Sequence, residues 1–427
     1  MKRVKKDGWY LSRGYSHFDH PLSFDAAAKI VKNPRRVASH SFLPLVSFTD
    51  VKRQFRTDNS DKTIPRKQRR KIVKSKRREI KYASHVDSAI FSYYAYLLQE
   101  RYEPLIRLEG LNKSIIGYRS GLGSNIDLAA DAFAEIAHRG DVVALCFDIE
   151  NFFPSILHSS LKAALCEILG VPVLSADWYA VFKNVCSYAD VELKDLALQE
   201  GFDPKDPPFP LVSDISSALL RSRSSKIIKK NSTNKAVPQG TPISAVFANV
   251  SMLPLDRAMH RWCLGISGSY RRYSDDIMLL VPPGFELEAE QKLISEACAL
   301  SLIVNAAKTE VSRFYLANGI QKCDIPVQYL GFIFDGDRVR LRDRALSRYY
   351  RRMTYATRQS VRGAGIAGKL ASQAHKRSLF RDFTHLGTRN FYTYAKRAHK
   401  KFPKSAIKRQ MRRHFQVLLR KLSNRGR

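Results

Sequence analysis

The chain has 427 residues, 44% of them hydrophobic, which suffices for two or three structural units around a substantial core. It carries 73 Lys plus Arg against 39 Asp plus Glu, a formal net charge of +34 at pH 7. Such a surplus repels itself in the compact state unless a polyanion neutralises it. Nucleic acid is therefore the first expected partner, with an anionic membrane surface or a merely solubilising face as alternatives.

The sequence contains no membrane-span signal and no cysteine framework. No stretch approaches the about 18 uncharged apolar residues of a span, and the basic residues 1–6 are followed by polar and aromatic residues. The six cysteines never form a close pair, which argues against a zinc knuckle or a disulfide scaffold. We therefore expect a soluble protein of a reducing cytoplasm.

Basic and apolar segments alternate in the first two thirds of the chain. Residues 52–81 contain 14 Lys or Arg and three acids, interrupted by Pro65 and an Asp-Asn-Ser stretch, which predicts a flexible or partly helical basic arm or a solvated loop. Residues 82–100 place apolar side chains at helical spacing and predict a helix. Two apolar runs, 142–149 and 277–281, are typical of buried strands.

The last part of the chain is strongly basic. Residues 344–427 hold 24 Lys or Arg against one acid, Asp382, with aromatic residues interleaved. This pattern predicts a basic α-helical domain whose aromatics mostly pack and whose basic face binds nucleic acid. Four cations of this face are expected to contact primer or template: Lys408, Arg409, Arg412 and Arg413.

Two adjacent acids lie between an aromatic-rich segment and an apolar run. The segment YRRYSDDIMLL at 270–280 places Asp275 and Asp276 where the tip of a β-hairpin is predicted. Paired carboxylates repel each other and lose solvation when buried, and a divalent cation relieves both costs. A surface turn with two acids is the alternative interpretation.

A third acid, Asp148, lies at the end of the other apolar run, in the segment ALCFDIENFFPSI at 144–156. If the two strands lie side by side, Asp148 and the turn with Asp275 and Asp276 converge on one point, as two-metal phosphoryl transfer requires. These carboxylates, with the adjacent Ile149, are therefore predicted to hold two Mg²⁺ ions, for which Mn²⁺ can substitute. One ion would activate the attacking 3′-hydroxyl, and the other would hold the triphosphate and neutralise the leaving pyrophosphate.

These two segments resemble the palm motifs of reverse transcriptases, and further segments occur in that family's order. The segment VPQGTPIS at 237–244 resembles its Gln-Gly turn, followed by a helix through Asn249 and Leu253 to Asp256. The segments NAAKT at 305–309 and YLGF at 329–332 resemble its lysine motif and its primer-gripping hairpin. The resemblance extends from about residue 80 to about residue 340.

The resemblance implies roles for several residues beside the carboxylates. Gln239 and Gly240 would contact the nascent base pair, unless Gly240 is simply a turn glycine. Phe153 would be the steric gate that crowds a ribonucleotide's 2′-hydroxyl, the alternative being a core phenylalanine. Lys308 would protonate the leaving pyrophosphate, the alternative being a charge on a helix face.

Two further sites are implied in the same way. Arg119, in the predicted fingers, would clamp the triphosphate as a bidentate cation, the alternative being an ion pair with Asp127 or Asp131. The hairpin would contact the primer, unless it only packs, through Tyr329, Leu330 and Gly331.

The fold implied by the resemblance is α+β, a right-hand polymerase. It would consist of an N-terminal extension at 1–50, fingers with the basic arm at 51–140, a palm with an antiparallel sheet at 141–340, and a basic helical thumb at 341–427. A helical insertion is expected within the palm at about 157–236.

The stretch ASHVD at 83–87, with the Tyr-Tyr and Tyr-Glu pairs that follow it, is most similar to bacterial reverse transcriptases of the defence-associated "unknown group", relatives of abortive-infection and retron enzymes. This similarity implies an RNA-directed DNA polymerase of the bacterial cytoplasm that copies a dedicated noncoding RNA in anti-phage defence, with an RNA template, a DNA product and dNTPs as partners. Group II intron and retron enzymes are alternatives of the same class. An RNA-dependent RNA polymerase and a non-catalytic RNA-binding scaffold are alternatives from other classes, and the primer and the oligomeric state stay open.

Overall fold

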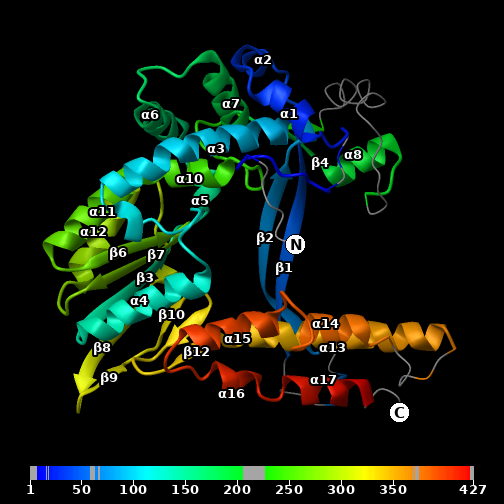
Figure 1. Ribbon diagram of the computed structural model, residues 1–427, viewed down its shortest axis with the longest axis vertical. Helices are drawn as coiled ribbons and strands as arrows, with labels where there is room; N and C mark the ends of the chain where they lie inside the picture. Colours follow the sequence, from blue (N-terminus) through cyan, green and yellow to red (C-terminus); the bar gives the residue numbers. More distant parts are fainter. Residues whose placement is uncertain are drawn as a thin grey trace. The chain divides into compact units, whose positions relative to one another are not determined.

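The computed structural model describes residues 7–15, 17, 19–57, 63–65, 68–204, 227–368, 370 and 375–423. Helices and strands are mixed along these residues, which confirms the predicted α+β class. The chain forms two compact units (Figure 1). Unit 1 comprises Met1–Tyr118, Ile149–Ala258 and Ile294–Val304, and unit 2 comprises Arg119–Asp148, Met259–Leu293 and Asn305–Arg427.

Helix α3 (His85–Leu108) is the helix that the apolar spacing predicts, and it organises unit 1. Five almost completely buried side chains recur at every fourth position along it: Ile90, Tyr94, Leu98, Tyr102 and Ile106. Because side chains four residues apart share one face of a helix, they form a continuous buried stripe. The helix begins three residues later than predicted, because the Ser84 side chain accepts a hydrogen bond from Asp87 N at 3.1 Å and caps the first turn.

Short helices surround α3. Helices α1 (Phe24–Val31), α6 (His158–Leu169), α7 (Ala176–Cys186) and α10 (Ser244–Ser251) all pack against it (Figure 1). Helix α2 (Pro34–Ala38) packs on α7. Unit 1 also contains the short helices η1 (Leu111–Lys113) and α5 (Phe152–Ser155).

The prediction that residues 52–81 form a flexible or partly helical basic arm is wrong. Strands β1 (Leu45–Thr57) and β2 (Arg70–Tyr82) form a long antiparallel ribbon, with β4 (Ala189–Glu192) and β5 (Ile228–Lys230) completing a four-stranded sheet in the order β2-β1-β4-β5. Backbone pairing between the two strands does not depend on side-chain polarity, so charge-rich strands can form it. Val46, Val191 and Leu196 form a buried cluster that anchors the base of the ribbon. The loop stretch predicted around residues 58–60 lies outside the described residues.

The region 157–236, predicted as a helical insertion, contains α6, α7 and α8 (Leu193–Glu200) together with β4 and β5, and residues 205–226 lie outside the described part. The prediction of a single helix after the Gln-Gly turn, through Asn249 and Leu253 to Asp256, is wrong. Helix α10 ends at Ser251, and α11 (Leu253–Gly265) follows it, running from unit 1 into unit 2. Pro254 explains the break, because proline has no N–H to donate and is favoured in the first turn of a helix.

A five-stranded antiparallel sheet forms the centre of unit 2. Strand β3 (Val142–Asp148) lies between β7 (Asp276–Val281) and β8 (Glu310–Ala317), with β6 (Ser269–Tyr273) and β9 (Ile320–Cys323) at the edges. The two apolar runs are thus confirmed as strands, and the sheet combines two segments far apart in sequence. Both strands are buried along most of their length, as expected for central strands.

Helix α4 (Asn125–Arg139) packs on this sheet at β3. The Gln321 side chain on β9 donates to the carbonyls of Ile136 at 2.8 Å and Gly140 at 2.6 Å. Helix α12 (Glu286–Ala299) begins in unit 2 and ends in unit 1.

A second, three-stranded sheet consists of β10 (Val327–Tyr329), β11 (Phe332–Phe334) and β12 (Val339–Leu341). The hairpin predicted at 329–332 is confirmed, because Leu330 (φ 44°) and Gly331 (φ 95°) form the two-residue turn between β10 and β11. Stacked rings join the two sheets: the ring centroid of Phe334 lies 5.0 Å from that of Phe133 of α4 and 5.8 Å from that of Phe314 of β8.

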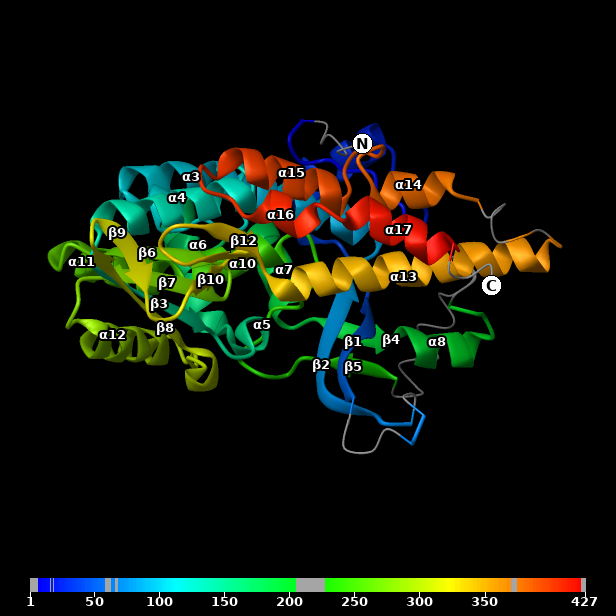
Figure 2. The same cartoon turned by 90° about the horizontal axis from the view of Figure 1, so that it is seen from below.

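The basic region is helical, as predicted. It contains α13 (Asp343–Ile366), α14 (Arg377–Phe383), α15 (Phe391–Lys401), α16 (Ile407–Met411) and α17 (His414–Ser423). Helices α14 and α17 pack on α13 (Figure 2). Buried side chains define one face of α13, at Tyr349, Met353, Thr357 and Ala364. All six cysteines are free thiols, and no helix in the described part of the chain is long and apolar enough to span a membrane.

Candidate active site

The pairing of β3 and β7 brings two predicted acids together. Asp148 is the last residue of β3 and Asp276 is the first residue of β7, and the two are direct partners across the ladder. Cα atoms of directly opposed residues on antiparallel strands lie about 4.5–5.5 Å apart. Both acids therefore lie close together, where β3 ends and β7 begins.

The turn between β6 and β7 brings in the third acid. Tyr273 and Asp276 close the hairpin, and Ser274 and Asp275 form its tip. Ser274 has φ 62°, as such a two-residue turn requires, and its carbonyl accepts a hydrogen bond from the Arg272 side chain at 3.1 Å. Arg272 is completely buried, so the turn is tied to the interior of unit 2. The predicted hairpin tip is thereby confirmed.

The three carboxylates influence one another electrostatically. Water reaches the Asp276 side chain, yet protein atoms crowd around it, and this partial burial is the main cause that raises its pKa to about 6. The negative charges of Asp275 and Asp148 raise it further, and the cations Arg342 and Lys308 lower it. Excess negative charge therefore gathers where β3 and β7 meet.

Lys308 lies within this cluster. Its ammonium group donates a hydrogen bond to the Asp148 carboxylate. The short helix η2 (Ala306–Lys308) positions it, because Asn305 N donates to the Asp148 carbonyl at 2.8 Å and holds the segment against the end of β3. Lys308 is thus not an isolated charge on a helix face, as the alternative interpretation had it.

Within the described residues, no group of three or more His, Cys, Asp and Glu side chains has the spacing that holds a metal ion. Part of the reason is that Lys308 contacts Asp148, so an ammonium cation balances the charge of that carboxylate.

Three other predicted residues gather in unit 1. Phe153, in α5, is half-buried, and its carbonyl accepts from Val237 N at 2.9 Å. The neighbouring Phe152 is the one that is buried, with 4% exposure, so the core position in this pair belongs to Phe152. Gln239 and Gly240 follow Val237 in a turn beside β2, where the Gln239 carbonyl accepts from Lys81 N at 2.9 Å.

Gly240 is required by its surroundings and not only by a turn. It has φ 130°, and a Cβ placed on it would lie 2.5 Å from the Lys81 carbonyl oxygen. Backbone cannot yield at that distance, so any side chain would push the turn away from β2.

A buried ion pair supports this turn. The Lys81 side chain is 6% exposed and pairs at 3.0 Å with both Asp190 and Glu79, and its ammonium lies 5.1 Å from the Tyr188 ring centroid. Burial lowers the pKa of Lys81, but hydrogen bonds to Asp190 and Glu79 outweigh burial, so the pKa is raised. The turn therefore packs against the backbone of a residue whose side chain is held in place by two ion pairs.

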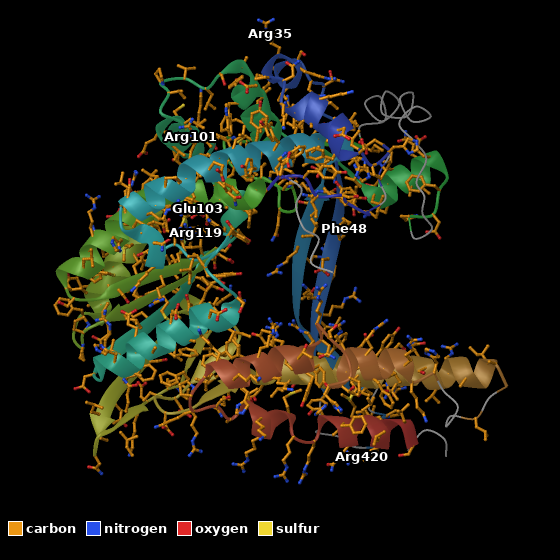
Figure 3. The ribbon with its side chains drawn as sticks, viewed as in Figure 1. Arg35, Phe48, Arg101, Glu103, Arg119 and Arg420 are labelled. Carbon is orange, nitrogen blue, oxygen red and sulfur yellow. The ribbon has the colours of Figure 1, made fainter. Side chains whose placement is uncertain are left out.

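The remaining predicted residues are dispersed. Ile149 is buried and pairs with Val304 in unit 1. Arg119, at the start of unit 2 (Figure 3), is half-buried, and Asp127, one of its proposed alternative partners, pairs with Lys401 at 3.4 Å. Tyr329 is buried, so only Leu330 and Gly331 of its hairpin are accessible to a ligand.

The basic cluster is exposed. Lys408, Arg409, Arg412 and Arg413 lie at α16 and just beyond it, and all four are exposed. Many side chains of the C-terminal helices end in nitrogen, including the labelled Arg420 of α17 (Figure 3). On the ribbon of unit 1, Phe48 is 41% exposed and labelled in the same view.

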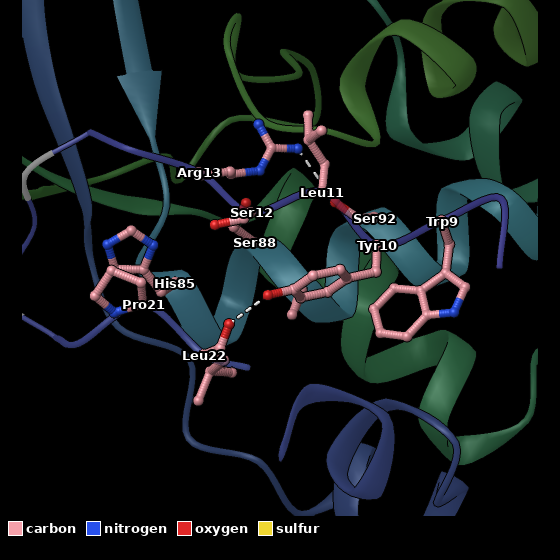
Figure 4. A pocket seen from close by; sticks show the side chains of 11 residues that line it. Trp9, Tyr10, Leu11, Ser12, Arg13, Pro21, Leu22, His85, Ser88 and Ser92 are labelled. Atoms are coloured by element: carbon pink, nitrogen blue, oxygen red, sulfur yellow. Dashed lines mark hydrogen bonds between the residues drawn. The ribbon is translucent and has the colours of Figure 1, made fainter. Parts of the chain in front are cut away.

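A small cavity lies between the N-terminal segment and α3 (Figure 4). Tyr10 donates to the Leu22 carbonyl at 2.5 Å and Arg13 donates to Ser92 at 3.2 Å across it. The cavity encloses about 20 Å³, the space of about one water molecule, and so it is not a ligand site.

Sequence reasoning missed Arg342. It follows β12 and precedes α13, and its charge acts on Asp276. Its side chain donates to Gln328 at 2.9 Å. The only signal was its position in a basic stretch after an apolar strand, and Asp276 lies far from that stretch in the sequence.

No protein-family model matches the sequence, and no curated protein is similar to it at a significant level. Among solved structures, the chain is similar to apo telomerase from Candida tropicalis truncated from its C-terminal domain, at 11% identity over 74% of this chain and 59% of the other, with a TM-score of 0.39. It is similar to telomerase from Candida albicans in complex with a fragment of telomeric RNA, at 11% identity over 96% and 64% of the two chains, with a TM-score of 0.39.

A third similar structure is an insertion-loop deletion mutant of the RNA-dependent RNA polymerase of a human picobirnavirus, at 14% identity over 62% of this chain and 41% of the other, with a TM-score of 0.36. The chain thus spans between 41% and 64% of the length of these three proteins. Such values do not define a function, which is proposed below from the carboxylate cluster.

Proposed function

We propose that the protein is a template-directed nucleic acid polymerase, and specifically an RNA-directed DNA polymerase. One observation carries the proposal: Asp148 and Asp276 are partners on adjacent antiparallel strands, and Asp275 precedes Asp276 in the hairpin turn. Carboxylates converging at strand ends suit nucleotidyl transfer, because the reaction needs positive charge held at one point against a triphosphate.

The oxygen donors of these residues are of the kind that divalent ions bind, although their spacing in the structure does not hold one. Oxygen donors are the ligands that Mg²⁺ prefers, and Asp148, Asp275 and Asp276 would hold it together with the carbonyl of Ile149. The raised pKa of Asp276 supports this assignment, because a nearby cation would relieve the repulsion that its neighbours cause. When bound, the ions would lower the pKa of a primer hydroxyl and neutralise the charge of the leaving pyrophosphate.

The chain's own side chains supply the other roles in this proposal. Lys308, already a hydrogen-bond donor to Asp148, would give a proton to the departing pyrophosphate. Arg119 would bind the triphosphate through its paired N–H groups. Gln239 and Gly240 would face the nascent base pair, with the backbone of the turn held against Lys81.

Deoxynucleotides are the preferred substrate in this proposal. Phe153 is half-buried, and an aromatic ring at the sugar position would exclude a 2′-hydroxyl by its size. This assignment favours a reverse transcriptase over an RNA-dependent RNA polymerase. We propose in turn a right-hand arrangement with the basic helices as the thumb, and a dedicated noncoding RNA as template in bacterial anti-phage defence.

A non-catalytic RNA-binding scaffold is the second candidate function. One observation favours it: the Lys308 ammonium already compensates Asp148, and no group of acids in the described residues has metal-binding spacing. In that case the carboxylates would have no catalytic role, and the protein would act only by binding RNA through its basic surface.

The test compares the wild-type protein with Asp275→Ala combined with Asp276→Ala. The wild type should incorporate dNTPs in the presence of Mg²⁺, and Mg²⁺ should raise its unfolding temperature, because a ligand that binds only the folded state stabilises it. The double variant should lose both effects and still bind RNA. A matched control, Glu288→Ala with Glu290→Ala, removes two acids of unit 2 outside the cluster and should keep both. DNA synthesis by the double variant would refute the site.

A further inference from the structure

A large cavity lies among the C-terminal helices of unit 2. It is open to solvent, has a volume of about 710 Å³, and is lined by residues of α15 and α16, by Ser405 and Arg412 beside α16, and by His414 of α17. Among the described residues that line it there is no acid, and five exposed cations are present: Lys396, Lys400, Lys408, Arg409 and Arg412. Volumes of about 300–1,000 Å³ suit a small organic molecule or a single nucleotide.

The five cations are held without counter-charges. None of them forms an ion pair within the described part of the chain, although their neighbours do. Lys401 pairs with Asp127 at 3.4 Å and Lys404 pairs with Asp337 at 2.7 Å. Positive charge that the protein does not neutralise attracts an anion, so the lining favours a negatively charged ligand.

The cavity also has an aromatic wall. The rings of Tyr392 and His414 stack with their centroids 4.1 Å apart and their planes 29° from parallel. Both residues line the cavity. Aromatic faces on which a base can stack, beside cations that hold the phosphates, are the arrangement by which proteins bind single strands.

His414 has an unmet hydrogen-bonding capacity. It is 6% exposed, and its Nδ1 lies 2.7 Å from the Met411 carbonyl, which can only accept, so Nδ1 carries the proton. Burial lowers the pKa of His414, so the ring is neutral and Nε2 is an acceptor. Nε2 has no partner among the described residues, and neither has Nδ1 of His399, another lining residue, and both atoms are buried from solvent.

These features together select the ligand. Inorganic phosphate would satisfy the cations but would leave most of the volume empty. A nucleotide carries both phosphate for the cations and a flat base for the rings.

We propose that this cavity binds one unpaired nucleotide of single-stranded RNA, with its base against Tyr392 and His414 and its flanking phosphates on the five cations. The proposal rests on the proposed function only in taking RNA as the partner. It distinguishes a site that holds a flipped-out or looped nucleotide from a basic surface that follows any phosphate backbone.

The test measures binding of fluorescein-labelled 12-nucleotide oligo(U) to the full chain by fluorescence anisotropy at several salt concentrations, without Mg²⁺ or dNTPs. Tyr392→Ala should weaken binding about tenfold at an unchanged salt slope, because it removes stacking and no charge, while Tyr392→Phe should bind as the wild type does. Lys408→Ala with Arg412→Ala should reduce the slope of log affinity against log salt by about 1.4, the value for two lost phosphate contacts on a single strand.

One control separates the site from general charge. Lys322→Ala with Arg340→Ala removes two exposed cations of unit 2 that do not line the cavity, and it should leave the slope unchanged.

The proposal is overturned if Tyr392→Ala and Tyr392→Phe both bind like the wild type, or if the control pair lowers the slope as much as the cavity pair does. Photo-cross-linking of wild-type protein to oligo(4-thiouridine) avoids any effect of substitution on folding. Cross-links to peptides with Tyr392 or His399 are expected, and cross-links confined to other segments would also overturn the proposal. Primer extension by the wild type is measured separately, so a failure of the proposed function leaves the binding result intact.

Discussion

Two cations compensate the acids at the end of β3 and β7. Lys308 could be anticipated, because its motif resembles that of a known family, and the structure joins it to Asp148. Arg342 could not, because its effect on Asp276 depends on where the second sheet places the start of α13. Residues linked by local sequence patterns are predictable, whereas residues brought in by a distant element are not.

Glu135 should make stability depend on acid pH. Burial would raise its pKa, but hydrogen bonds from Arg271 and Arg139 outweigh burial and lower the pKa to about 2. A carboxylate with a folded-state pKa below its unfolded value stabilises the fold above about pH 4.5, and this contribution is lost as the pH falls toward 2. Glu135→Gln should therefore reduce the free energy of unfolding by about 2 kcal/mol at pH 7, since it leaves the buried Arg271 charge unpaired.

Urea unfolding at pH 7 and at pH 3 measures this effect. The difference between the wild type and Glu135→Gln should shrink at the lower pH, while the control Glu290→Gln should match the wild type at both. A difference that does not change with pH would show that the carboxylate charge is not the source.

Phe153 should determine the choice of sugar. Phe153→Val leaves the acids untouched and opens space beside the incoming sugar, so the ratio of kcat/KM for dNTPs over rNTPs should fall about tenfold or more. Phe152→Leu is the matched control, because Phe152 is the buried member of the pair and should affect stability and not selectivity. An unchanged ratio for Phe153→Val would return Phe153 to a packing role.

At the level of elements, the sequence predicted what repeats locally and failed where pairing is long-range. The buried stripe of α3 and the apolar strands β3 and β7 were predictable because their side chains recur with the period of the element. The ribbon of β1 and β2 was not, because its strands are rich in Lys and Arg and their pairing is backbone-driven. The break between α10 and α11 was predictable from Pro254, which favours the first turn of a new helix.

The start of α3 depends on an acid far away in the sequence. The Asp19 carboxylate accepts hydrogen bonds from His85 N at 2.9 Å and Val86 N at 3.1 Å. Burial would raise its pKa, but hydrogen bonds from His17 and these N–H groups lower it. Asp19→Ala should lower the free energy of unfolding by about 1–2 kcal/mol, since it leaves helix N-terminal donors unsatisfied. Glu100→Ala, an exposed acid on the same helix, should change it little, and equal effects in the two variants in urea unfolding would contradict this role for Asp19.

At the scale of the whole molecule, each unit takes chain from three segments. Asp148 and Ile149 are neighbours in sequence and belong to different units. Composition along the chain cannot show this, because it averages over contiguous residues, so the domain boundaries drawn from the sequence stay a prediction. Composition did show the accumulation of charge, with 24 cations and one acid after residue 343.

A polymerase requires the acids, the sheet that pairs them and a polyanionic partner, which suits a chain of net charge +34. The most direct measurement is extension of a labelled DNA primer on an RNA template by the purified full chain, with dNTPs or rNTPs and with or without Mg²⁺. The wild type should extend the primer in a reaction that requires Mg²⁺ and prefers dNTPs, and Asp148→Asn should not extend it. A wild-type protein that binds the primer and template tightly and extends the primer neither with dNTPs nor with rNTPs would contradict a polymerase function and favour the RNA-binding scaffold.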